Sequence, residues 1–334
     1  MPNILNDIDN FVNCYTRDNT NISRISIALL REGVVTNFYV NDRTTDKPHY
    51  FNDRPFEPEM EIPLVSEITK DNSAHRSKLR FPFYKDGQFS GLIYVNSTNY
   101  SYLKSKFNSI SNDLTALSEL LVDNLSSYIH FKELAFKYLK ASQEKDIETY
   151  NHLLRIKSYT YRLAREYLKS NPKSNINPFL ISEYSVYHDI GKLYIPSEVL
   201  LFKGIFDIHQ RKVMNEHCIL GLEIIQQIKN QTSFKNIDTS VLENIIKHHH
   251  EKWDGNGYPD KLAGINIPIE ARIVSICDVF DALISKRPYK EPWSSEKALA
   301  FINSQRGVMF EPEIVDLMLN ISDELYSYYL SMID

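Results

Sequence analysis

The chain has 334 residues, which is long enough for two domains with a substantial core in each. Apolar residues make up 43% of it and charged residues 24%, values that are ordinary for globular proteins and argue against disorder. A net charge of -5 argues against a general binder of DNA or RNA, which usually presents a basic face. The protein can still bind a small anionic substrate if metal ions or a few Lys or Arg side chains neutralise its charge locally.

Membrane insertion and export are not expected. The sequence has no run of about 18 apolar residues, and its first residues lack the basic flank and apolar stretch of a secretory signal. Its three cysteines (Cys14, Cys218 and Cys277) are far apart and odd in number, so no disulfide framework is expected. We therefore expect a cytoplasmic protein without membrane association.

Residues 1–106 have the pattern of an α+β domain. The turn Lys85-Asp86-Gly87-Gln88 is typical of a β-hairpin, since Asp-Gly suits a two-residue loop. Residues 41–75 are rich in Pro, Asp and Asn and are interpreted mostly as loop. Four short β-prone runs are expected to form strands: 26–30, 34–40, 79–84 and 89–95.

Residues 107–142 form the predicted linker. Apolar residues recur there at alternating spacings of three and four, without Gly or Pro, and Asn124 occupies a d-type position. The positions of this heptad pattern are Phe107, Ile110, Leu114, Leu117, Leu121, Asn124, Tyr128, Phe131, Ala135 and Tyr138. We expect a parallel dimeric coiled coil, because the pattern lies between two domain-like regions. The alternative is one long helix packed on its own domain.

Residues 143–334 are expected to be all-α. Loops such as 171–175 separate the segments with helical periodicity. The predicted helices are 143–170, 178–190, 207–229, 238–250, 268–285, 294–304 and 311–330.

Histidines and carboxylates recur on these predicted helices. Glu148 and His152 are spaced i, i+4 and so project from one helix face. His188 and Asp189 close a predicted helix, and Lys192 follows them. Each signal is weak by itself, because a single histidine is more often an ordinary core or surface residue; His49, His75, His130 and His209 are interpreted in that way.

Further candidates follow toward the C-terminus. His217 lies inside a predicted helix, and His249-His250 end another directly before a turn of Gly, Asn and Pro. Asp278 lies in an otherwise apolar helix, where an unpaired carboxylate would be costly. Asp281 is interpreted either as a helix-face carboxylate or as a partner of a ligating histidine. As a set, these residues indicate a metal site.

The residue types restrict the chemistry of that site. Imidazole and carboxylate without cysteine suit Fe, Mn or Zn in a hydrolytic site better than a structural zinc. Two or three close metal ions can hold a bridging hydroxide at neutral pH and clamp the attacking and leaving oxygens of a phosphoryl group.

Three motifs resemble the HD-GYP family of the HD phosphohydrolase superfamily: HDIGK at 188–192, HHE at 249–251 and DGNGYP at 254–259. The resemblance covers about residues 143–330. It implies an all-helical, metal-dependent phosphodiesterase that hydrolyses cyclic di-GMP to pGpG, with GMP as a second product to be tested, by means of a metal-bridged hydroxide. The segment 202–210 matches the family's sequence pattern less closely. It contains no expected ligand, so this difference puts the shape of the loop in doubt rather than the activity.

The resemblance implies roles for individual residues. Asp189 would bridge metals and Lys192 would face the scissile phosphate, and these two are the expected catalytic residues. The expected metal ligands are Glu148, His152, His188, Asp189, His217, His249, His250 and Asp278. Glu148 indicates the subgroup with three metal ions, so the expected cofactor is two or three divalent ions, iron first and manganese as the alternative. His248 is then an extra, structural residue.

The resemblance also implies substrate contacts from Lys192, Arg287 and Lys290, where Arg287 suits bidentate contact and Lys290 a point charge. Without the resemblance, Arg287 and Lys290 would be interpreted as solvated loop cations. The loop Gly257, Tyr258 and Pro259 is a candidate pocket wall and a docking surface for diguanylate cyclase (GGDEF) domains. Two alternatives stay open: hydrolysis of another cyclic dinucleotide such as 3′3′-cGAMP, and a catalytically silent receptor or interaction module.

Residues 1–106 resemble a GAF sensory domain. The order of the predicted strands, the late hairpin at 79–95 and the exit into a long helix support this resemblance. It implies a regulatory unit whose ligand the residues do not identify. The complete expectation is a homodimer with a GAF-like sensor (1–106), a coiled-coil linker (107–142) and a phosphodiesterase domain (143–334).

Overall fold

The computed structural model describes most of the chain as two units, one over residues 2–129 and the other from His130 onward. The residues described are 4–31, 34–44, 54–55, 57–69, 73–145, 150–231, 238–286 and 291–332. None of the described helices combines the length and the apolar character that crossing a bilayer requires.

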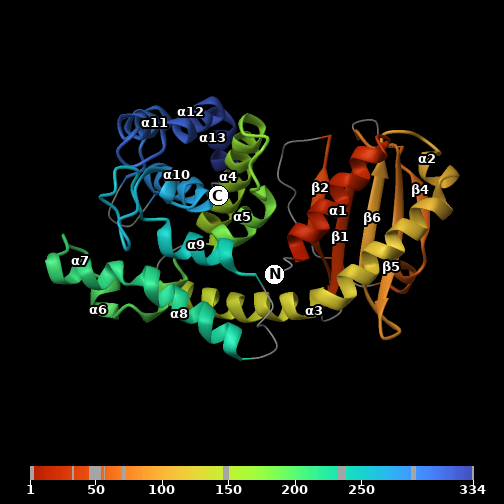
Figure 1. Ribbon diagram of the computed structural model, residues 1–334, viewed down its shortest axis with the longest axis horizontal. Helices are drawn as coiled ribbons and strands as arrows, with labels where there is room; N and C mark the ends of the chain where they lie inside the picture. The colour runs from red at the N-terminus through yellow and green to blue at the C-terminus, as the bar shows by residue number, and fades with distance from the viewer. Residues whose placement is uncertain are drawn as a thin grey trace. The chain divides into compact units, whose positions relative to one another are not determined.

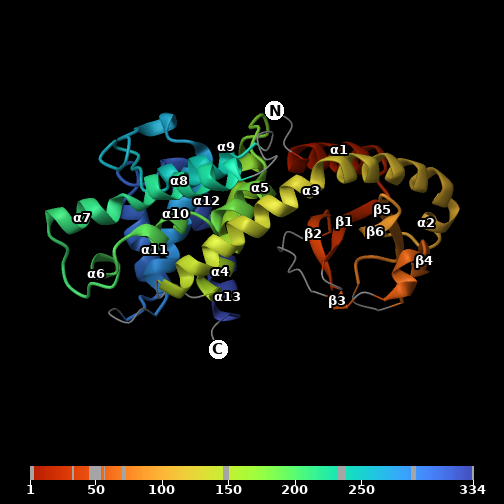
Figure 2. The same ribbon diagram turned by 90° about the horizontal axis from the view of Figure 1, so that it is seen from below.

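The N-terminal unit is built on one antiparallel sheet of six strands in the order β3-β2-β1-β6-β5-β4. Helix α1 (Ile4–Asp18) and the first half of α3 (Phe107–Lys145) run side by side over one face of it, with the short α2 (Tyr102–Ser105) nearby (Figures 1 and 2). The strands are β1 (Ile22–Arg31), β2 (Val34–Asp42), β3 (Arg54–Pro55), β4 (Leu64–Glu67), β5 (Ser77–Lys85) and β6 (Gln88–Ser97).

Side-chain alternation explains the sheet. On β1, Ile25, Ile27 and Leu29 point to one face, and Ala28 points to the other, where it joins a core cluster with Leu92 of β6. All of these residues are buried, so both faces of the central strand are covered. The predicted hairpin is confirmed, and its turn residues Asp86 and Gly87 have positive φ (50° and 77°), as a two-residue hairpin loop requires.

All four predicted strands are confirmed as parts of β1, β2, β5 and β6. The loop interpretation of residues 41–75 is wrong in part, because β3, β4 and a 3-10 turn η1 (Pro58–Glu61) form there. β3 has two residues, and most side chains of β4 are exposed, so neither leaves an alternating pattern. Helix α1 was not predicted.

Helix α3 is one continuous helix of 39 residues, which confirms that the predicted linker segment is helical. Its heptad residues Ile110, Leu114, Leu117 and Leu121 are at most 2% exposed within a single chain. Buried side chains cannot also form a seam between two copies, so this structure favours the long packed helix over the coiled coil at these positions. The side chains of Asn124 and Tyr128 lie outside the described part of the chain.

The second unit is helical, and its elements position the site. α4 packs against α5, α10, α12 and α13, while α9 packs against α5, α8 and α10. These elements are α4 (Tyr150–Ser170), α5 (Pro178–Ser185), η2 (Ile190–Tyr194), α6 (Ser197–Leu200), α7 (Ile208–Asn215), α8 (His217–Asn230), α9 (Ser240–His248), η4 (Gly264–Asn266), α10 (Ile269–Ile284), α11 (Ser295–Ser304), α12 (Pro312–Asn320) and α13 (Ser322–Leu330).

Several predicted helices are divided in the structure. The helix predicted over 178–190 ends at Ser185 and is followed by the 3-10 turn η2, and the one over 207–229 breaks at Glu216. Close packing of η2 on α8 explains the first break. A Cβ atom on Gly191 would lie 1.9 Å from the carbonyl oxygen of His217, so only glycine allows this approach.

Candidate metal centre

Seven of the eight expected ligands come together in the second unit, in two groups. The first group is Asp189, His217, His249 and His250, and the second is His152, His188 and Asp278. Within each group, one nitrogen or oxygen atom per residue lies within 4.8 Å of those of the other members. The eighth expected ligand, Glu148, lies outside the described residues, as do Arg287 and Lys290.

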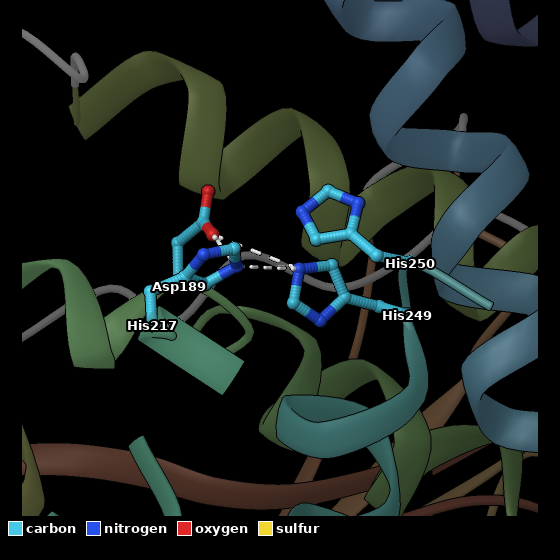
Figure 3. A group of neighbouring side chains, drawn as sticks. All are labelled: Asp189, His217, His249 and His250. Carbon is cyan, nitrogen blue, oxygen red and sulfur yellow. Dashed lines mark hydrogen bonds and ion pairs between the residues drawn. The ribbon is translucent and has the colours of Figure 1, made fainter. Parts of the chain in front are cut away.

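The first group gathers around Asp189, which directly precedes η2 (Figure 3). Asp189 Oδ1 lies 3.2 Å from His217 Nε2 and 3.6 Å from His249 Nε2. His217 is the first residue of α8, and His249 follows α9, so the packing of α8 on α9 brings the two imidazoles together. Their Nε2 atoms lie 3.5 Å apart.

The second group lies where α4 and α10 meet the end of α5. Asp278 Oδ1 lies 3.8 Å from the Nε2 atoms of both His152 and His188. His188 Nε2 is also 3.2 Å from Asp189 Oδ2. The two oxygens of Asp189 therefore face different groups, which is the geometry of a bridging carboxylate.

Backbone carbonyl groups fix the orientation of three imidazoles. A carbonyl oxygen only accepts hydrogen bonds, so in each ring Nδ1 holds the proton and Nε2 of the neutral ring has the lone pair. The three hydrogen bonds run from His188 to Ser185 (2.8 Å), from His217 to Met214 (2.8 Å) and from His249 to Ile245 (3.0 Å). Neutral imidazoles with Nε2 directed inward are suited to bind metal ions.

Burial keeps two rings of the first group neutral. It lowers the pKa of His217 to about 4, against the opposing effect of Asp189, and it lowers the pKa of His250 well below its ordinary value. Burial alone would raise the pKa of Asp189, but the ammonium group of Lys192 holds it well below its usual range. Near neutral pH the group therefore combines the anionic carboxylate of Asp189 with neutral rings at His217 and His250.

This donor set fits a divalent metal ion. The Nε2 atoms of His217 and His249 face each other with lone pairs at 3.5 Å, an arrangement that only a proton or a cation between them relieves. Asp189 Oδ1 is buried and, within the described part of the chain, accepts no hydrogen bond. Nitrogen and oxygen donors without a thiolate suit iron, manganese or zinc.

Lys192 is the cation at this site. It belongs to η2, and its Nζ lies 2.8 Å from Asp189 Oδ2, at the carboxylate oxygen that faces His188. Its side chain is 19% exposed, so it lies at the edge of the buried cluster rather than inside it. An ammonium group in this position can contact an anionic ligand that approaches the carboxylate.

The Gly-Tyr-Pro loop packs directly on the first group. The ring of Tyr258 lies 4.8 Å from that of His250, at an interplanar angle of 30°. Gly257 is buried, and a Cβ atom there would lie 2.3 Å from the backbone nitrogen of Lys252, so glycine is required for the loop to fold back. Pro259 is half-buried beside Tyr258.

Glu251 holds this loop in place. Its side chain is buried, and one carboxylate oxygen accepts a hydrogen bond of 2.7 Å from the backbone N–H of Asp260. His248 Nδ1 lies 3.9 Å from the same oxygen and belongs to neither metal group, in agreement with its expected structural role. The loop is therefore fixed from inside the unit.

Asp281 is the residue that sequence reasoning left undecided, and the structure places it against a ligand. Its Oδ2 lies 2.7 Å from Nδ1 of His152, and Arg155 donates two hydrogen bonds to the same carboxylate. Burial would raise the pKa of Asp281, but His152 and Arg155 lower it below its ordinary value. Arg155 was not predicted; the available signal was its i, i+3 spacing from His152 on one helix.

Comparison with known proteins shows which family and which proteins this chain is similar to. The model of the HD domain family matches residues 141–314. A 3'3'-cGAMP-specific phosphodiesterase 2 of Vibrio cholerae is 37% identical over 203 residues, which cover 61% of this chain and 37% of that protein. The cyclic di-GMP phosphodiesterase response regulator RpfG of Xanthomonas campestris is 46% identical over 132 residues, 40% of this chain and 33% of RpfG.

A cyclic di-GMP phosphodiesterase of Thermotoga maritima is 30% identical over 235 residues, which cover 70% of this chain and 61% of that protein. The chain thus spans between about a third and three fifths of the length of these relatives.

Proposed function

The chain belongs to the HD domain family, and we propose that its helical unit is a metal-dependent phosphodiesterase of the HD-GYP type that hydrolyses cyclic di-GMP to pGpG. One observation supports this proposal above the others. Asp189 directs its two oxygens to two different groups of imidazoles, as a carboxylate shared by two metal ions would. A cyclic dinucleotide as substrate agrees with the names of the relatives.

In the proposed centre, one ion would be held by Asp189, His217, His249 and His250. A second ion would be held by His152, His188 and Asp278, with Asp189 shared between the two ions. Glu148 would add a ligand for a third. Bound divalent ions would supply an activated water and polarise the phosphoryl oxygens. We favour iron, with manganese as the alternative, because the donors are imidazole and carboxylate.

The residues of the chain bind and orient the substrate. Lys192 would contact the scissile phosphate from the edge of the cluster, where a cation stabilises the negative charge that develops in the transition state. Tyr258 would form one wall of the pocket, since its ring lies against His250. Arg287 and Lys290 are the proposed contacts to the second phosphate or to guanine.

Hydrolysis of 3′3′-cGAMP is the second candidate function, because one of the similar proteins is named for that activity. A catalytically silent receptor is the less favoured alternative. Gathering seven ionisable groups, each of them buried or half-buried, is costly unless they bind cations, and a module that only docks has no need of them.

The N-terminal unit is proposed to be a GAF-like regulatory domain. The antiparallel order of its sheet and the exit into α3 support this assignment. The end of α3 contacts the catalytic elements: Lys145 Nζ donates to the backbone oxygens of Leu193 (2.8 Å) and Ile195 (2.5 Å), at the end of the turn that contains Lys192. A shift of α3 would thus reach Lys192. A homodimer, and a GGDEF domain that docks on the Gly257–Pro259 loop, complete the proposal.

Turnover by protein purified without oxygen tests the proposed function. The protein should hydrolyse cyclic di-GMP with Fe(II) or Mn(II), and a parallel assay with 3′3′-cGAMP decides between the two substrates. Binding of both dinucleotides without hydrolysis in either metal would contradict the proposal and favour the receptor. Light scattering tests the homodimer separately.

A further inference from the structure

We infer that Asp281, held by Arg155, is a positioning residue that orients His152 and thereby determines metal binding by the second group. This inference builds on the proposed metal centre and does not require that the substrate be a cyclic dinucleotide. Asp281 belongs to neither of the two metal groups. It would act through the imidazole whose outer nitrogen it contacts.

The first step is the state of His152. Its side chain is 5% exposed and that of Asp281 is 1% exposed, and the distance of 2.7 Å between Nδ1 and Oδ2 is that of a charge-assisted hydrogen bond. An ionised carboxylate only accepts, so Nδ1 must hold the proton. Nε2 of the neutral ring then has the lone pair, and it faces Asp278 Oδ1 at 3.8 Å.

The second step is the difference from the neighbouring ligands. His188, His217 and His249 donate Nδ1–H to backbone carbonyls, which are neutral and cannot be replaced by mutation. His152 instead donates to a charged side chain. A carboxylate partner makes an imidazole a stronger electron donor than a carbonyl partner does, so His152 gains both orientation and basicity from Asp281.

The third step is what holds Asp281. Arg155 donates from Nε to Oδ1 (2.6 Å) and from Nη2 to Oδ2 (2.9 Å), a bidentate contact that fixes the carboxylate plane. The ring of Tyr329 lies against the guanidinium group, with 5.5 Å between the ring centroid and Arg155 Cζ. The orientation of His152 thus depends on a rigid, buried ion pair rather than on a mobile side chain.

Two helices each contribute a ligand and its support. On α4, Arg155 lies one turn after His152, and on α10, Asp281 lies one turn after Asp278. Arg155 Nη2 also donates to Ser285 Oγ (2.9 Å), two positions before Arg287 in the sequence. The same network therefore joins the second metal group to Ser285, the residue that directly follows α10.

The substitution Asp281→Asn tests the inference. An asparagine can donate from its amide nitrogen to Nδ1, which would move the imidazole proton to Nε2 and remove the lone pair. We expect the second ion to bind about 10- to 100-fold more weakly, as for other partners of ligating histidines. Manganese content after gel filtration should fall by one ion per chain, while the first group keeps its ion.

The matched control is Glu183→Gln. Glu183 is also a buried carboxylate of this unit and forms ion pairs with Lys132 and Lys157, but it does not belong to either metal group. Its loss should lower stability and leave the metal content unchanged. A purely structural role for Asp281 predicts the same behaviour for both variants, and that result would overturn the inference.

Two further measurements keep the test decisive. If Asp281→Asn does not fold, Arg155→Lys is the second variant, because it keeps the charge but loses the bidentate contact. It should weaken binding of the second ion. Normal metal content in this variant would refute the proposal. Nitrogen NMR of labelled histidines in the metal-free protein should show the His152 tautomer change in Asp281→Asn. Both readouts stand even if no cyclic dinucleotide is hydrolysed, so failure of the proposed function is distinguished from failure of this inference.

Discussion

The two groups of expected ligands are built from the same residue types but are supported in different ways. In the first group, His217 and His249 donate Nδ1–H to backbone carbonyls of the helical turn before them. In the second group, His152 donates to the side chain of Asp281, more than a hundred residues away in the sequence. His217 and His249 are therefore fixed by local helix geometry, as His188 of the second group also is, whereas the orientation of His152 depends on the packing of α4 against α10.

This difference separates local from distant determinants of the site. A histidine just after the end of a helix finds its carbonyl acceptor in that helix, as His217 does in α7 and His249 does in α9. The second group also requires the buried ion pair between Arg155 of α4 and Asp281 of α10. A substitution should therefore change metal binding in one group more than in the other. Substitution of Asp189, which both groups share, is the exception.

Asp189→Ala should have the largest effect, because it removes the carboxylate that faces both groups. We expect metal content to fall in both groups. Turnover should fall on the order of 10²- to 10⁴-fold, because the transition state loses several kcal/mol of stabilisation. Elemental analysis and initial rates measure the two effects. Normal turnover in this variant would remove Asp189 from the site.

Lys192→Met should affect turnover and spare the ions. The ammonium group lies beside Asp189 but is not a ligand, so both groups should keep their metal. Loss of one stabilising cation in a site of this kind costs about 10²- to 10³-fold in kcat. Lys192→Arg, which retains the charge, is the control. A large loss of metal in Lys192→Met would show that the lysine supports the ligands instead.

Tyr258→Leu should have a smaller effect, confined to the first group. The tyrosine ring lies against His250 at 4.8 Å, and such aromatic contacts contribute about 0.5–1.5 kcal/mol. Turnover should therefore fall roughly 2- to 10-fold, while Tyr258→Phe, which keeps the ring, stays close to the unsubstituted protein. Equal losses in both variants would point to the hydroxyl group and not to the stacking.

Glu183→Gln should leave both groups intact and change only stability. The buried Glu183 has its pKa lowered from 4.5 to about 2: burial opposes the shift, but Lys132 and Lys157 outweigh it. Its contribution is fully present above pH 4.5 and is lost as the pH falls through about 2. Removing one partner of a buried ion pair costs about 3–5 kcal/mol.

Denaturant unfolding at several pH values measures this effect. The difference in unfolding free energy between Glu183→Gln and the unsubstituted protein should be largest near neutral pH and shrink as the pH approaches 2. A difference that is independent of pH would mean that the ion pairs contribute nothing.

The sequence predicted the parts of the molecule that depend on local patterns. The four long strands, the Asp86-Gly87 hairpin and the continuous helix α3 all follow from alternation, turn chemistry and helical spacing. The short strands β3 and β4 could not be predicted in this way, because pairing with neighbours rather than their own pattern makes them strands.

The same limit applies to the site. Five of the seven expected ligands that lie together belong to motifs at or beside helix ends, where the direction of a side chain is set locally: His188, Asp189, His217, His249 and His250. Asp281 and Arg155 are different, since a buried carboxylate and a buried arginine become informative only when their contact, across 126 residues of sequence, is known. Burial of the heptad residues of α3 within one chain was likewise decided by tertiary packing.

Metal stoichiometry is the most direct test of the central claim that Asp189 is shared by two metal-binding groups. Protein purified and reconstituted with Fe(II) or Mn(II) without oxygen should hold at least two ions per chain by elemental analysis, and Asp189→Ala should lose ions from both groups. A protein that holds no more than one ion, or an Asp189→Ala variant with unchanged metal content, would contradict the account.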